Sequence, residues 1–196
     1  MTFKGEKKIQ VVCFGDSITK GAKVNGHSWV YFLSKDHKNI NFINEGRNGR
    51  KTSDKGELIP ILKKYPNANY YLIFLGVNDL KDGNDSLVNN CIDNMKWMIK
   101  KIKETNEEAK IILLSPANIN LKTMSKINVK KKYNENTELS LIKLEKKYKN
   151  LAAEESVGFI SLLKAVSPQN YEDGLHPNEH GQKQIAVVVW KVLGKQ

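Results

Sequence analysis

The sequence predicts an α/β fold with a five-stranded parallel sheet and helices between the strands. Short apolar runs of the β type alternate with longer amphipathic stretches along the whole chain. The two central runs, residues 70–75 and 111–115, are apolar almost throughout, as expected of strands covered on both faces. The length of 196 residues suits one well-cored domain, so we expect a single domain over residues 1–196.

The strands follow from composition and spacing. The first is IQVVCF at residues 9–14, and a short second strand includes residues 41–43. YYLIFL at residues 70–75 and IILLS at residues 111–115 are the third and fourth. A weaker fifth strand lies at residues 158–161.

Helical spacing of apolar residues predicts four helices between and after these strands. They cover residues 55–64, 86–104, 137–155 and 178–193, and Pro177 stands at the entry of the last. Trp97 and Trp190 lie on apolar helix stripes and are interpreted as core residues.

One long irregular stretch, residues 118–132, follows the fourth strand and is a candidate lid or rim. Its lysine cluster, KKK at residues 130–132, is interpreted as a solvated helix start or loop.

The charge balance, 32 basic against 21 acidic residues, gives a net charge of +11. Only two of the basic residues are arginines, and the lysines are scattered over nearly every segment, so we expect no specific nucleic-acid binding. No apolar run is long enough for a membrane span, and the polar start, residues 1–10, predicts no secretory signal. The expected location is the cytoplasm. Cys13 and Cys91 have neither metal-ligand nor disulfide spacing and are interpreted as core residues.

Polar residues follow the predicted strands at the points where a parallel sheet binds ligands. They are Gly-Asp-Ser at 15–17, Asn-Glu-Gly-Arg-Asn-Gly at 44–49, Gly-Val-Asn-Asp at 76–79 and, before the last helix, Asp-Gly-Leu-His-Pro at 173–177. Because ligands gather outside the carboxyl ends of the strands, we expect these four segments to meet at one rim.

Together the four segments contain the groups that acyl transfer requires. A serine hydroxyl needs a base, and the base needs a carboxylate partner, which predicts Ser17, His176 and Asp173 as a catalytic triad. The backbone N–H groups of Ser17 and Gly49 and the side-chain amide of Asn78 are candidate oxyanion donors. The triad needs neither a metal nor an organic cofactor.

Each segment alone has a structural interpretation. Gly-Asp-Ser can be a turn with a helix N-cap at Ser17, Asn-Gly at 48–49 a tight turn, and Asn78 a helix cap. A lone His before a helix is more often structural than catalytic. The combination, in this order and at strand ends, favours the catalytic interpretation.

The same segments resemble the SGNH hydrolase superfamily, the GDSL esterases and lipases. VVCFGDSITKG resembles the first block of that family, INEGRNGRKT the second, FLGVNDLK the third and DGLHPNEHG the fifth, over nearly the whole chain. The resemblance implies a three-layer α/β/α flavodoxin-like fold. It also implies a nucleophile and first oxyanion donor at Ser17, further donors at Gly49 and Asn78, and a triad completed by Asp173 and His176.

The second and third blocks look most like the arylesterase-type and small bacterial acylhydrolase branch. Lys51 departs from that pattern, because many relatives have a small or hydroxyl residue there, and Val77 stands where relatives often have Thr. We therefore expect a serine esterase acting on small-molecule esters, with a short acyl chain because residues 118–132 contain few large apolar side chains. The alternatives in the same family are a carbohydrate O-acetylesterase, a lysophospholipase or thioesterase, and an acyltransferase. The alternative of another class is a non-catalytic binding module.

Charged residues around the predicted site have open roles. Asp16 and Asp79 are expected to be hydrogen-bond partners of site residues rather than acids or bases. Arg47 and Arg50 either brace their loop through carboxylates such as Glu45 or Asp54, the interpretation we favour, or one of them binds an anionic substrate group at the rim.

Other side chains near the motifs have competing interpretations. His27, Trp29 and Tyr31 either line a substrate pocket or pack in the core. His176 and His180 lie four residues apart, but Pro177 intervenes and no third ligand is evident, so no metal site is expected.

Overall fold

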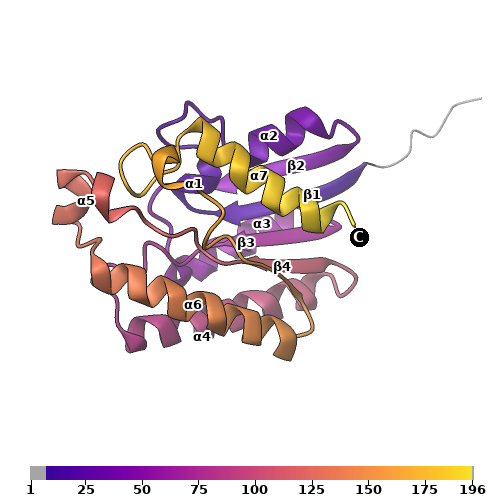
Figure 1. Ribbon diagram of the computed structural model, residues 1–196. Coiled ribbons are helices and arrows are strands. Elements are labelled where there is room, and N and C mark those ends of the chain that lie inside the picture. The colour runs from indigo at the N-terminus through magenta and orange to yellow at the C-terminus, as the bar shows by residue number, and fades with distance from the viewer. Residues whose placement is uncertain (1–7, 196) are drawn as a thin grey trace, which may run out of the picture.

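The computed structural model describes residues 8–195 (Figure 1). Residues 1–7, on which the expected absence of a secretory signal partly depends, lie outside the described residues. Among residues 8–195, no helix has both the length and the apolar character needed to cross a membrane.

The core of the fold is a five-stranded, fully parallel sheet with the order β2-β1-β3-β4-β5. The predicted fold class and all five predicted strands are confirmed, with ends displaced by at most three residues. The strands are β1 (Ile9–Gly15), β2 (Ile40–Gly46), β3 (Tyr70–Phe74), β4 (Lys110–Leu114) and β5 (Gly158–Ile160).

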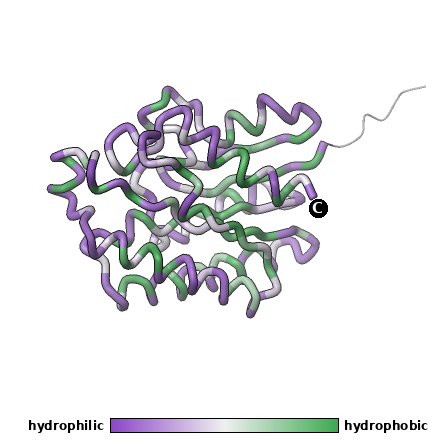
Figure 2. Tube along the Cα trace, in the orientation of Figure 1, coloured by the Kyte–Doolittle hydropathy of each residue, from purple (hydrophilic) through white to green (hydrophobic). Residues whose placement is uncertain are grey.

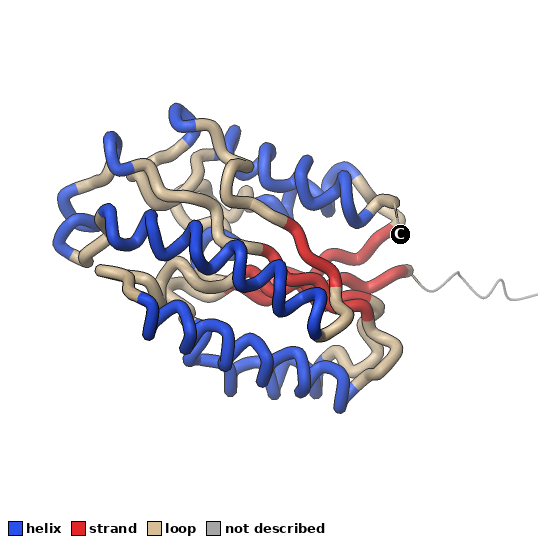
Figure 3. The backbone as a smooth tube through the Cα atoms, turned by 60° about the horizontal axis from the view of Figure 1, so that its bottom comes forward, coloured by secondary structure: helices blue, strands red, loops and turns tan. Residues whose placement is uncertain are grey.

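Helices cover both faces of the sheet, giving three layers (Figures 1 and 3). One face packs against α1 (Ser17–Lys20), α2 (Trp29–Asp36) and α7 (Glu179–Leu193). The other packs against α3 (Leu58–Lys64), α4 (Asp85–Thr105) and α6 (Glu135–Glu154). The shorter elements are the 3-10 turns η1 (Thr52–Glu57), η2 (Leu121–Thr123) and η3 (Pro168–Asn170), and the helix α5 (Lys126–Lys130).

Alternation along the central strands explains why their sequences are apolar throughout. In β3, Tyr71 and Ile73 face the α4/α6 core, whereas Leu72 and Phe74 face the α2/α7 core. Neither face of the strand meets water, and hydrophobic residues concentrate along the sheet in Figure 2. Each such side chain contributes about 1.5–3 kcal/mol by leaving water.

Three helices of the described residues were not predicted: α1, α2 and the short α5. α1 has only four residues, too few for a periodic signal. α2 contains buried Trp29, Phe32 and Leu33 at helical spacing, which was a readable signal, but its first residues were interpreted only as pocket or core residues.

Three boundary predictions need correction. The predicted helix at residues 55–64 is a 3-10 turn followed by a shorter α-helix. Residues 118–132 are not irregular throughout, because they contain η2 and α5. α7 begins at Glu179 with Asn178 as its N-cap, accepting from the N–H of Gly181, so Pro177 lies before the helix rather than in its first turn.

The order of the strands around β1 creates a position where a ligand can bind. From β1 the chain passes to β2 on one side, and later to β3 on the other side of β1. Ligands in open α/β sheets bind outside the carboxyl ends of the strands at such a switch point. The segments after β1, β2 and β3 all begin there.

Candidate active site

Ser17 follows β1 directly and is the first residue of α1. Its side chain is nearly buried, and its Oγ lies 3.0 Å from Nε2 of His176. The N–H groups in the first turn of a helix have no partner within the helix, so the N–H of Ser17 faces outward from α1. Asp16, not Ser17, caps this helix, because its carboxylate accepts from the N–H of Ile18 at 2.9 Å.

His176 and Asp173 form the second part of the cluster. Nδ1 of His176 lies 3.0 and 3.1 Å from the two carboxylate oxygens of Asp173. The backbone N–H groups of Leu175 and His176 donate to the same carboxylate, at 3.1 and 2.8 Å. A carboxylate beside Nδ1 favours the tautomer with its proton on Nδ1, which leaves the Nε2 lone pair facing Ser17.

The local backbone makes this tight loop possible. Gly174 has φ +80°, and a Cβ there would lie 2.5 Å from the Cα of Met124, so only glycine fits. Burial raises the pKa of Asp173, but the hydrogen bonds from the ring and backbone of His176 outweigh burial and hold that pKa well below its ordinary value.

Gly49 lies in the loop after β2, has φ +71° and is exposed, with open space where a Cβ would stand. Among residues 8–195 no acceptor contacts its backbone N–H. This N–H is therefore available as a donor at the rim.

Arg47 and Arg50 brace this loop, the interpretation favoured from the sequence. Arg50 is buried, donates to the backbone oxygens of Gly15 and Glu45, and reaches Glu57 at 3.0 Å. Burial lowers its pKa, against the opposing effect of Glu57. Arg47 is more exposed and binds Glu57 at 2.7 Å.

Asp54 and Glu57 are the carboxylate partners of the two arginines. Arg47 also binds Asp54, at 2.6 Å. Of the two carboxylates expected from the sequence, only Asp54 takes part, because Glu45 contributes its backbone oxygen. Glu57, one turn further along η1, was not expected.

Asn78 is buried after β3, beside the loop of Arg50. Its Nδ2 donates to Oδ2 of Asp16 and to the backbone oxygen of Arg50, both at 3.2 Å, and its Oδ1 accepts from the hydroxyl of Tyr133 at 2.8 Å. The alternative role of Asn78 as a helix cap is wrong, since Asn84 caps α4.

Asp16 and Asp79 are hydrogen-bond partners of neighbouring site segments. Asp79 accepts from the N–H of Thr52 at 3.0 Å and from its hydroxyl at 2.6 Å, which ties the loop after β2 to the loop after β3. Burial raises the pKa of Asp79 despite these bonds. Burial also raises the pKa of Asp16 to about 6, against the opposing N–H of Ile18.

Several candidates lie outside this cluster. Trp29 is fully buried in the core and donates to Thr19, whereas Tyr31 is exposed and stacks on His27, which binds Glu179.

Trp97, Trp190, Cys13, Cys91 and His180 also lie outside the Ser17 cluster. Trp97 and Trp190 are only partly buried against the core, and Cys13 and Cys91 are buried thiols whose pKa values burial raises. His180 is exposed, and no cluster of metal-ligating side chains occurs in the described part of the chain.

Two site contacts were missed from the sequence. Tyr133 and Asn128 are both buried and contact Asn78 and the backbone of Asp173, respectively. The available signal was that Asn128 and Tyr133 lie in a lysine-rich segment without being lysines themselves. Neither residue belongs to a recognisable motif, so the sequence did not connect them with the site.

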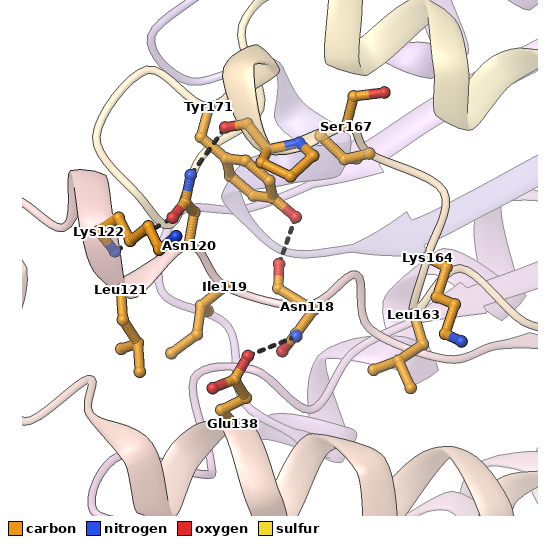
Figure 4. Close-up of a pocket in the computed structure, with 12 residues that line it drawn as sticks. Asn118, Ile119, Asn120, Leu121, Lys122, Glu138, Leu163, Lys164, Ser167 and Tyr171 are labelled. Atoms are coloured by element: carbon orange, nitrogen blue, oxygen red, sulfur yellow. Dashed lines mark hydrogen bonds between the residues drawn. The ribbon is translucent and has the colours of Figure 1, made fainter.

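A cavity of about 650 Å³ lies beside Glu138 of α6 (Figure 4). Its lining comes from the segments after β4 and β5, and neither Ser17 nor His176 takes part. In its wall, Tyr171 donates to the backbone oxygen of Asn118, and Asn118 donates to Glu138 at 2.8 Å (Figure 4). The cavity is separate from the Ser17 cluster.

Known proteins resemble this chain over most of its length. The model of the GDSL-like Lipase/Acylhydrolase family matches residues 13–184. A search of curated proteins found no match.

Solved structures cover nearly the entire chain. The aryl esterase of M. smegmatis has a TM-score of 0.82 at 19% identity, covering 95% of this chain and 99% of its own. A carbohydrate acetylesterase family member from Sinorhizobium meliloti has a TM-score of 0.79 at 18% identity, covering 95% and 98%. A member of the lipolytic protein G-D-S-L family from Veillonella parvula has a TM-score of 0.70 at 21% identity, covering 96% and 100%.

Proposed function

The chain belongs to the GDSL-like lipase/acylhydrolase family and is an ester-hydrolysing enzyme, and we propose that it works as a serine esterase through Ser17, His176 and Asp173. The observation that carries the proposal is the continuous line of contacts from Ser17 Oγ to His176 Nε2 and from His176 Nδ1 to Asp173. This is the relation between nucleophile, base and orienting carboxylate that acyl transfer needs.

In the acylation step, Oγ of Ser17 attacks the acyl carbon while Nε2 of His176 takes its proton. The carbonyl π electrons move to oxygen and form a tetrahedral oxyanion. Asp173 stabilises the imidazolium, because its carboxylate carries negative charge over the whole neutral range. When the intermediate collapses, His176 gives its proton to the leaving alcohol, and the acyl group stays on Ser17.

The oxyanion takes hydrogen bonds from the N–H groups of Ser17 and Gly49 and from Nδ2 of Asn78. The two existing bonds of Nδ2 are long, at 3.2 Å, and a full oxyanion is a stronger acceptor than a backbone carbonyl. Nδ2 therefore shares or exchanges the bond to Arg50 when the oxyanion forms. A single donor of this kind accounts for about 10²–10³ in kcat.

Deacylation repeats the same steps with water. His176 takes a proton from water, the hydroxide oxygen attacks the acyl carbon, and the proton returns to Oγ of Ser17 as the carboxylic acid leaves. No metal or organic cofactor takes part in these steps.

A short acyl chain fits the site. In the part of the chain that the structure describes, five cavities with volumes of about 350–650 Å³ have neither Ser17 nor His176 in their lining. A long chain bound at Ser17 would leave most of its apolar surface in water, without the roughly 0.8 kcal/mol per buried CH₂ that a deep pocket provides.

The first experiment is hydrolysis of p-nitrophenyl esters from acetate to decanoate by the wild type and Ser17→Ala. The exposed Ser53→Ala is the matched control. We expect activity that declines with chain length, disappears in Ser17→Ala and persists in Ser53→Ala. Equal activity of Ser17→Ala and the wild type would overturn the proposal. Acetylated sugars, lysophospholipids, acyl thioesters and a competing alcohol then separate the esterase from the alternatives of the same family.

Three further expectations stay predictions: the single domain over residues 1–196, the cytoplasmic location and the lack of specific nucleic-acid binding.

A further inference from the structure

The segment between β4 and α6, expected to be a lid or rim, is bonded to the catalytic loop. The N–H of Asn120 donates to the backbone oxygen of Gly174 at 2.7 Å, and the N–H of Ser125 donates to that of Asp173 at 3.1 Å. Nδ2 of Asn128, itself buried, donates to the same Asp173 oxygen at 3.1 Å. These contacts hold the segment against the loop that contains Asp173.

The end of the same segment reaches the opposite side of the site through Tyr133. Its side chain is 2% exposed, and its hydroxyl donates to Oδ1 of Asn78 at 2.8 Å. A carboxamide has a carbonyl oxygen and an NH₂ group of nearly equal size, so its orientation is decided by its partners. With Tyr133 donating to Oδ1, the NH₂ group must face Asp16 and Arg50.

Tyr133 is the donor in this bond, because both hydrogens of Nδ2 are taken by Asp16 and Arg50, which leaves the oxygen of the carboxamide for the phenol. Burial raises its pKa well above the ordinary value, and the nearby carboxylates of Asp16, Asp79 and Asp173 raise it further. The phenol therefore keeps its proton throughout the range in which an esterase works. Nζ of Lys81 lies 5.5 Å from the centroid of the Tyr133 ring.

We propose that Tyr133 is a positioning residue for ester hydrolysis: its hydroxyl fixes the carboxamide of Asn78 so that Nδ2 is presented to the oxyanion. The inference rests on the proposed function, because it takes Asn78 as an oxyanion donor. Tyr133 touches no substrate and acts only through Asn78. Without its hydroxyl, only the two long bonds to Asp16 and Arg50 orient the amide, and the flipped amide, which presents Oδ1 to a developing negative charge, becomes more populated.

The test separates the hydroxyl from the ring. Tyr133→Phe keeps the ring in the core and removes only the donor. Tyr71→Phe is the matched control, because Tyr71 is also fully buried and its hydroxyl donates to a backbone oxygen, that of Tyr65. Tyr71 is the second residue of β3, so it lies far from the carboxyl end of the strand, where the site is. We expect Tyr133→Phe to lower kcat for p-nitrophenyl acetate about tenfold, as loss of one productive hydrogen bond implies, with KM unchanged. Tyr71→Phe should leave both constants unchanged.

A double-mutant cycle with Asn78→Ala identifies the route of the effect. The loss in Tyr133→Phe should disappear in the Asn78→Ala background, because no amide remains to be oriented. The rate of inactivation by diethyl p-nitrophenyl phosphate, whose attack by serine also builds charge on an oxygen, should fall by the same factor as kcat.

Each contrary result has a separate meaning. If Asn78→Ala lowers kcat about 10²-fold or more and Tyr133→Phe does not lower it, the inference about Tyr133 is wrong and the proposed function stands. If Tyr133→Phe lowers kcat equally in both backgrounds, its effect does not pass through Asn78 and the inference is again wrong. If Asn78→Ala itself has wild-type kcat, the oxyanion role and the inference fall together, while the Ser17→Ala result still decides the nucleophile.

Discussion

Replacing Asp173 with Asn changes one atom of the proposed triad and should remove nearly all activity. In the structure the carboxylate accepts from Nδ1 of His176 and from the backbone N–H groups of Leu175 and His176. The oxygen of an Asn can keep the backbone bonds that Oδ1 accepts, and the NH₂ group then replaces Oδ2, the nearer partner of Nδ1 at 3.0 Å. The imidazole must turn its Nδ1 lone pair toward that group and carry its proton on Nε2, where it can no longer accept the proton of Ser17.

The expected loss in kcat is about 10⁴-fold, the effect of a wrong tautomer in a Ser-His-Asp triad, or about 5 kcal/mol of barrier. The free energy of unfolding should fall much less, by about 1.5–3 kcal/mol at pH 8, the range for a hydrogen bond to a charged group. Because the folded pKa of Asp173 is below its unfolded value, this contribution is present above about pH 4 and disappears as the pH falls toward the folded pKa.

The assay is steady-state hydrolysis of p-nitrophenyl acetate at pH 8, with urea unfolding of the same samples. Glu172→Gln is the matched control, since it removes a carboxylate from the adjacent, exposed position. Asp173→Asn activity within about tenfold of the wild type, in a folded protein, would refute the tautomer argument, because that argument requires a loss near 10⁴. A comparable loss in Glu172→Gln would show that general charge, and not the contact with His176, is responsible.

Three further predictions concern the frame of the site. Arg50→Met should lower the free energy of unfolding by about 3 kcal/mol in urea denaturation, because it removes the charged donor that bonds the backbone oxygens of Gly15 and Glu45; a change below about 0.5 kcal/mol would contradict the bracing role. Gly174→Ala should lower both kcat and the thermal midpoint, because its Cβ meets the backbone of Met124 at a positive φ; a wild-type midpoint would show that the loop accommodates a side chain. Asp16 has a folded pKa of about 6, above the unfolded value, so it stabilises the fold at low pH and loses this contribution as the pH rises through about 6. The increase in wild-type stability between pH 8 and pH 5 should therefore be smaller in Asp16→Asn, and equal pH profiles in urea denaturation would contradict this.

The fold could be predicted because its signals are local. The apolar runs that became β3 and β4 are buried on both faces, so almost every position in them had to be apolar. α4 and α6 are long enough for their apolar stripes to repeat several times. α1 has a single turn, and the strand order leaves no local trace, so neither could be predicted from periodicity.

The site could be predicted to the level of its chemical groups. Ser17, Asn78 and His176 stand at points where elements end, and a polar residue there is a visible departure from the apolar pattern. The bracing role of Arg50 was the favoured interpretation, but its backbone partner Gly15 and the role of Tyr133 could not be predicted, because these contacts join different segments of the chain.

By itself, the sequence determined the fold class, the five strands and the set of groups that could perform acyl transfer. These properties depend on burial and residue type, which act along the chain. Only the tertiary structure decided that Ser17 meets His176 at 3.0 Å, that Arg50 braces a loop, and that Tyr133 orients Asn78. Such contacts join residues dozens of positions apart, and a hydrogen bond has effect only within a few tenths of an ångström, a precision that the packing of the three layers supplies.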